Sequence, residues 1–171
     1  MDKHRGVFLD LSSELTGYSV IELEGTGLTD LYFGILCNDI GPGISEILFH
    51  TAEKVLEEKG EARAHAMQVE IAASTLLWPV CESLVMLWYQ GQWTRMTGFW
   101  YQYVAGIKPP KSSPVPDIPP GGTFVPSAAA YTEQLSYRSA GAHPPGAHPT
   151  GFGSWSLVPV FGDFTIDNKK S

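Results

Sequence analysis

Apolar residues recur at helical spacing along most of residues 7–105, and this pattern predicts a helical body. In residues 7–17, Phe8, Leu11 and Leu15 share one face, and Gly17 can adopt the left-handed conformation that ends a helix. Residues 26–38 predict a second helix, and its apolar face consists of Leu28, Leu31, Tyr32, Ile35 and Leu36.

The next segment, from Asp39 to Gly43, contains two glycines and a proline and predicts a break. Residues 44–59 then form the clearest helical pattern, with an apolar stripe on one side and charged residues on the other. Gly60 is expected to end this helix.

Residues 61–89 predict one long helix or a pair of helices. Apolar positions from Met67 to Trp88 alternate spacings of four and three, but Pro79 removes a helical hydrogen bond and predicts a kink or a restart. Residues 71–89 hold a single charge, Glu82, and are long enough to cross a bilayer. Because that charge would cost about 2–3 kcal/mol at mid-membrane, we interpret the segment as a core helix, with a membrane span as the alternative.

The character of the chain changes after residue 105. Residues 106–126 contain seven prolines and predict an extended, polyproline-like connector. Ser127 is a candidate N-cap for a short helix ending near Arg138. The predicted fold class is therefore all-α. A compact body of about four or five helices occupies residues 1–105, and a long irregular Pro/Gly-rich docking arm with one short helix occupies residues 127–171.

Composition adds a reason to expect a protein partner. Charged residues make up only 17% of the chain, which also holds five tryptophans, seven tyrosines and eight phenylalanines. Interface cores are rich in aromatic residues and poor in charge, although a large internal aromatic core is the alternative. The net charge is −8 over residues 1–70 and +1 over the rest, so no basic surface for nucleic acid is expected.

Aromatic residues are densest between residues 87 and 103, where two glycines interrupt them. Tryptophan and tyrosine suit interface cores because they combine a large apolar area with a polar edge. A second group lies in the Gly/Pro-rich sequence 141–155, whose restricted backbone would lose little entropy on docking. The candidate partner-binding residues are Trp88, Tyr89, Trp93, Trp100, His143, Pro145, Phe152 and Trp155.

The sequence offers little catalytic or metal chemistry. His143 and His148 are the best-spaced metal candidates, but the prolines between them exclude a helix that would place both rings on one face. Cys81 lies in an apolar helix without a nearby cation and should be an inert thiol; its pairing with Cys37 in a disulfide is left open. We therefore expect no catalytic, cofactor or metal site, the alternative being a site built from both histidines and Glu82.

Three stretches, taken in order, carry a resemblance to a known family: FLDLSSELTG (residues 8–17), LWYQGQW (87–93) and YTEQLSYRSAGAHPPGAHPTGFGSW (131–155). Together they resemble the small subunit of membrane-bound flavin-dependent sugar and polyol dehydrogenases. This family includes the sorbitol dehydrogenase small subunit and is related to the small subunits of fructose and glucose dehydrogenases.

The resemblance implies a non-catalytic accessory subunit. Its partners would be a large FAD-containing dehydrogenase subunit, which it binds and stabilises and whose export it assists, and, where present, a multihaem cytochrome c subunit. FAD and haem would belong to those partners. The complex would lie on the periplasmic side of the inner membrane, and this chain would meet the membrane only through the complex.

The family's small subunits often carry a twin-arginine leader. Here no Arg-Arg pair and no apolar run precede Phe8, so the sequence predicts no signal peptide and departs from the family's pattern at this point. The alternative function is a stand-alone helical module whose aromatic groove binds a peptide or small ligand.

Overall fold

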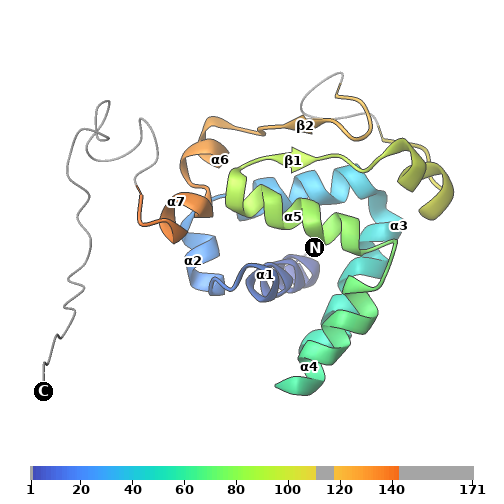
Figure 1. The fold of residues 1–171 in the computed structure, drawn as a ribbon, viewed down its shortest axis with the longest axis horizontal. Coiled ribbons are helices and arrows are strands. Elements are labelled where there is room, and N and C mark those ends of the chain that lie inside the picture. Colours follow the sequence, from blue (N-terminus) through green and yellow to red (C-terminus); the bar gives the residue numbers. More distant parts are fainter. Residues whose placement is uncertain (1, 111–117, 143–171) are drawn as a thin grey trace, which may run out of the picture.

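The computed structural model describes residues 2–110 and 118–142 (Figure 1). Of these residues, 68% are helical and 3% lie in strands, so the fold class is all-α, as the sequence predicts. The candidates His143, Pro145, His148, Phe152 and Trp155 lie outside the described residues.

The first helix is α1 (Asp2–Thr16). Gly17 follows it in the left-handed conformation, with a φ of 76°, and ends the helix as predicted. It is followed by α2 (Val20–Gly25), a short helix that the sequence analysis did not predict. A capping box starts α2: Ser19 Oγ accepts a hydrogen bond from the Glu22 amide, and the Glu22 carboxylate accepts one from the Ser19 amide.

The second and third predicted helices form the two halves of α3 (Thr29–Glu57). They meet at a kink where Gly41 has φ 75° and ψ 165°, so the break expected around this glycine is confirmed. Pro42 follows directly and needs no hydrogen-bond acceptor, which suits the first turn of the second half. Helix α3 ends at Glu57, three residues before the expected stop at Gly60.

Residues 61–89 form two separate helical units. The first consists of α4 (Glu61–Ala66) and the π-helical turn η1 (Met67–Ala72), and the second is α5 (Trp78–Gln90). Pro79 lies in the first turn of α5, so the expected restart is confirmed. The apolar stripe predicted from Met67 to Trp88 is not continuous, because η1 ends at Ala72 and α5 begins at Trp78. Within residues 2–110 and 118–142, no helix has the length and apolar character needed to span a membrane.

A small antiparallel ribbon lies over α5 and was not predicted. Strand β1 (Trp93–Thr94) pairs with β2 (Thr123–Phe124), with Trp93 opposite Phe124. The π-helical turn η2 (Trp100–Val104) follows β1. The ribbon brings the second half of the proline-rich connector against the body.

Two short helices end the described chain, α6 (Ala128–Thr132) and α7 (Leu135–Ser139). Ser127 caps α6, as predicted, by accepting a hydrogen bond from the Ala130 amide at 3.0 Å. The single helix expected here is divided in two. Ala130 and Leu135 are fully buried and belong to the hydrophobic core, so the described part of the expected arm is packed into the body.

The core lies where α1, α3 and α5 meet, with α5 between α1 and β1 (Figure 1). Its largest side chains are aromatic. Phe8, Tyr32 and Trp88 are fully buried, and the rings of Tyr32 and Trp88 meet edge to face at a centroid distance of 4.7 Å. This core fixes the outward faces of α5 and of the segment after β1.

Candidate binding cleft

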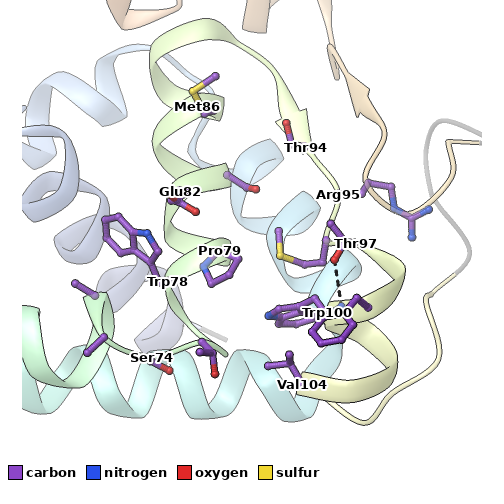
Figure 2. Close-up of a pocket in the computed structure, with 16 residues that line it drawn as sticks. Ser74, Trp78, Pro79, Glu82, Met86, Thr94, Arg95, Thr97, Trp100 and Val104 are labelled. Atoms are coloured by element: carbon purple, nitrogen blue, oxygen red, sulfur yellow. Dashed lines mark hydrogen bonds between the residues drawn. The ribbon is translucent and has the colours of Figure 1, made fainter.

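An open cleft of about 730 Å³ runs along the outer face of α5 (Figure 2). Trp78, Glu82 and Met86, one helical turn apart, line it from α5. Thr94, Arg95, Met96, Thr97, Phe99, Trp100 and Val104 form the opposite wall, and the turn of residues 72–75 lies at one end.

Several apolar side chains that line the cleft are exposed: Trp78 by 37%, Met86 by 39% and Phe99 by 66%. Phe99 packs against Tyr103, which is 69% exposed and is not part of the lining. These two residues, here called the aromatic rim, lie one turn apart with ring centroids 5.2 Å from each other. Contiguous apolar surface of this kind is typical of binding sites.

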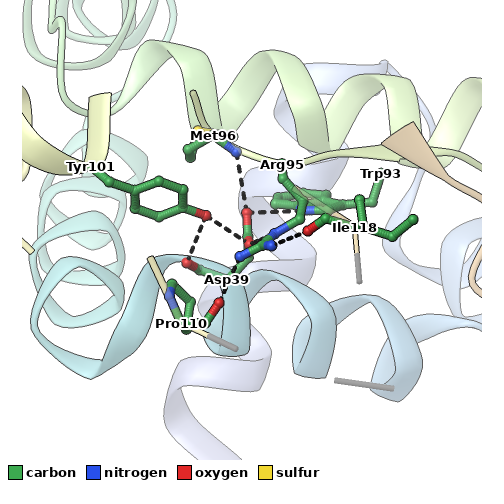
Figure 3. Close-up of polar contacts among 7 residues, drawn as sticks. All are labelled: Asp39, Trp93, Arg95, Met96, Tyr101, Pro110 and Ile118. Carbon is green, nitrogen blue, oxygen red and sulfur yellow. Dashed lines mark hydrogen bonds and ion pairs between the residues drawn. The ribbon is translucent and has the colours of Figure 1, made fainter. Parts of the chain in front are cut away.

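The wall opposite α5 is held by a buried carboxylate, Asp39, just before the kink of α3 (Figure 3). Asp39 Oδ1 accepts hydrogen bonds from Tyr101 Oη at 2.7 Å and from Arg95 Nε at 2.8 Å. Asp39 Oδ2 accepts one from Trp93 Nε1 at 3.1 Å and one from the Met96 amide at 3.3 Å. The single carboxylate of Asp39 thus accepts hydrogen bonds from four residues between positions 93 and 101.

Arg95 extends this cluster to the proline-rich connector. Its guanidinium also donates to the carbonyl oxygens of Pro110, at 2.8 Å, and Ile118. Burial disfavours the charged form, but the hydrogen bond and charge of Asp39 outweigh it and raise the pKa of Arg95. Burial, together with the Asp39 charge, raises the pKa of Tyr101, so its phenol stays protonated and donates. The buried charged groups of the wall, Asp39 and Arg95, are therefore paired with each other and with hydrogen-bond partners from the connector and from residues 93–101.

Among residues 2–110 and 118–142, the charged residues that line the cleft are Arg95 and Glu82. The Glu82 side chain is exposed on the middle turn of α5 and forms no ion pair within the described part of the chain. The charge of Arg95 is matched by Asp39, whereas the charge of Glu82 is not matched by any of these described residues.

The candidate residues of the aromatic series have different environments. Trp88 and Trp93 are fully buried and offer no surface to a partner in this conformation. Tyr89 is half-buried and donates its hydroxyl to the Thr16 carbonyl oxygen at 2.8 Å. Trp100 is 4% exposed and donates Nε1 to the Leu76 carbonyl oxygen at 3.1 Å, yet it lines the cleft. For Trp88 and Trp93, the structure favours the alternative that these aromatics complete the chain's own core.

The candidate residues chosen from the sequence do not include Trp78, Met86 and Phe99, which are exposed in the cleft, or Tyr103, which packs against Phe99. Phe99 and Tyr103 do belong to the aromatic series between residues 87 and 103. A signal was present for each pair. If a new helix starts near Pro79, Trp78 and Met86 lie four residues before and four residues after Glu82, on the same helix face. Phe99 and Tyr103 also lie four apart, directly after Gly98.

Neither cysteine forms a disulfide in the structure. Burial, with a smaller effect from the Glu82 charge, raises the pKa of Cys81 to about 12, so this thiol is protonated at neutral pH. Burial also raises the pKa of Cys37, which is half-buried. Among residues 2–110 and 118–142, no three His, Cys, Asp or Glu side chains are grouped to hold a metal ion.

Comparison of this chain with protein-family models, with curated proteins and with solved structures gives no match. The chemistry of the cleft must therefore be argued from its own residues.

Proposed function

We propose that this chain is the non-catalytic small subunit of a flavin-dependent sugar or polyol dehydrogenase complex. In this proposal the cleft binds the large FAD-containing subunit and stabilises it. The observation that carries the binding role is the exposed apolar surface of the cleft and its aromatic rim. Fully burying one exposed large apolar side chain contributes about 1.5–3 kcal/mol, and the partly exposed side chains of this surface would each contribute a share of that in proportion to their exposed area.

The choice of partner comes from the sequence resemblance. It places FAD, and haem where a multihaem cytochrome c subunit is present, in the partner chains. It also places the complex on the periplasmic side of the inner membrane, with membrane contact made only through the complex. The wall built on Asp39 supports a docking role, because a preorganised surface loses little entropy on binding.

Co-expression with a large subunit of this dehydrogenase family from the same genome tests the proposal. Replacing the aromatic rim by serine (Phe99→Ser with Tyr103→Ser) should weaken co-purification at least tenfold, because truncation at the centre of an interface costs more than 1 kcal/mol per residue. Ile21→Ser is the matched control: Ile21 is 82% exposed on α2, away from the cleft, and its replacement should change nothing. A large subunit that folds, retains FAD and turns over equally well without this chain contradicts the proposal.

A stand-alone binding module is the second candidate function, and the size of the cleft favours it. A volume of about 730 Å³ lies within the range of small-molecule sites. Such a module would stay monomeric in the presence of the large subunit and would bind an apolar ligand that shifts tryptophan fluorescence, through Trp78 and Trp100.

A further inference from the structure

We infer that the occupant of the cleft is an amphipathic helix of the partner protein that places a lysine or arginine opposite Glu82. This inference rests on the proposed function, because it specifies the chemistry by which the partner is recognised. It depends on three features of the cleft: an unmatched carboxylate, a neighbouring cation that is already paired, and a regular spacing of side chains along α5.

The first feature is the position of Glu82. It lies on α5 between the apolar side chains of Trp78 and Met86, in a lining whose other charged residue is Arg95 (Figure 2). In the free chain its carboxylate is hydrated. An apolar partner that covered the two flanking side chains would remove that water, and an unpaired buried charge is costly. A partner that covers this surface avoids that cost when it brings a cation to Glu82.

The second feature is that Arg95 does not supply this cation. It is 4% exposed, its Nε binds Asp39, and its terminal nitrogens donate to the carbonyl oxygens of Pro110 and Ile118. Turning Arg95 toward Glu82 would leave the buried Asp39 carboxylate without a counter-charge. The cleft thus selects for a positive partner.

The third feature is geometric. Trp78, Glu82 and Met86 follow one another at four-residue intervals, which span about 12 Å along a helix. The order apolar, acidic, apolar is complemented by a segment with the order apolar, basic, apolar. Two turns of an amphipathic helix present such a row at i, i+4 and i+8, which is a common way for a helix to bind a groove.

A charge-swap experiment on the full-length chain tests this inference. Two synthetic helical peptides of 18 residues would be identical except for a central lysine or glutamate, with leucine four residues away on each side. We expect the wild-type chain to bind the lysine peptide about tenfold or more tightly than the glutamate peptide. Glu82→Lys should reverse this preference. Glu70→Lys, which changes an exposed carboxylate outside the cleft lining, should leave the preference intact.

Several outcomes would overturn the inference: equal affinity for the two peptides, binding of neither, a preference that survives Glu82→Lys, or the same shift in Glu70→Lys. Self-association that disappears with the serine replacement of the aromatic rim would also overturn it, since a second copy of the chain would then be the occupant. The two proposals fail separately. A successful charge swap without co-purification of the large subunit rejects only the flavoprotein partner, whereas co-purification that is insensitive to Glu82→Lys rejects only the helix with its cation.

Discussion

Asp39 shows how much of the cleft depends on a single residue. Its carboxylate receives hydrogen bonds from Trp93, Arg95, Tyr101 and the Met96 amide, and these donors lie 54–62 residues further along the chain. The sequence places Asp39 beside a Gly-Pro break, where an aspartate is common and usually exposed. Nothing in local spacing indicates so distant a set of donors, which is why this cluster could not be predicted from the sequence.

Asp39→Asn should destabilise the protein by about 3 kcal/mol or more, because it leaves the Arg95 cation buried without a counter-charge. The side-chain NH2 group of the asparagine would also face N–H or O–H groups that donate to the carboxylate oxygens in the wild type. The free energy of unfolding in urea, followed by tryptophan fluorescence, measures the loss.

Asp30→Asn is the matched control for this prediction. Asp30 also pairs with an arginine, at 2.6 Å from Arg5 Nε, but its side chain is 81% exposed. Exposed pairs contribute about 0–1 kcal/mol, so this change should be nearly neutral. Equal losses in the two variants would show that the Asp39 cluster does not hold the wall.

At the scale of helices and turns, glycine and proline were the best guides. Gly17 ends α1, Gly41 marks the kink of α3 and Pro79 starts α5, each as predicted, because these residues act on the local backbone. Apolar spacing was less reliable. The apolar spacing continues through residues 73–77, but the chain forms a turn there. In this turn Ser74 Oγ accepts a hydrogen bond from the Leu77 amide at 3.1 Å. The capping box that begins at Ser19 was readable and would have identified α2.

The kink of α3 gives a prediction with an internal control. Gly41 has φ 75° and ψ 165°, a region that is essentially restricted to glycine. Outside the local backbone of the helix, no atom lies within 4 Å of a Cβ added there, so the cost of about 1–3 kcal/mol expected for Gly41→Ala comes from backbone strain. Gly34, in the first half of the same helix, has equal space and no positive φ.

Gly34→Ala should therefore stabilise the protein by about 0.5–1 kcal/mol, through the higher helix propensity of alanine. Thermal unfolding of the two variants should give midpoints displaced in opposite directions from wild type. Displacement in the same direction would mean that the kink at Gly41 is not a strained, glycine-dependent feature of the fold.

For the whole molecule, the sequence separates a body from a proline-rich connector and an arm, while the described part of the chain forms one core. Local composition predicts irregular backbone for residues 106–126, and in the structure residues 106–110 and 118–122 form neither helix nor strand, whereas Thr123 and Phe124 form β2. Composition does not reveal that Arg95 binds Pro110 and Ile118, or that Leu135 is fully buried. Sequence spacing alone could have grouped Trp78 with Met86, but only the inward packing of Trp88 and Trp93 shows which aromatic residues of the series remain exposed.

If residues 127–142 belong to this core, a cavity made there should destabilise the whole protein. Leu135→Ala removes a fully buried side chain on α7, next to α5, and should cost about 2–5 kcal/mol. Unfolding should remain a single transition, displaced to lower urea, since one core unfolds cooperatively. Val125→Ala, a change at a position that is 42% exposed, is the matched control and should shift stability by about 0.5 kcal/mol or less. An unchanged main transition in Leu135→Ala would instead mean that α6 and α7 fold apart from α5, as the arm of the sequence-based interpretation would.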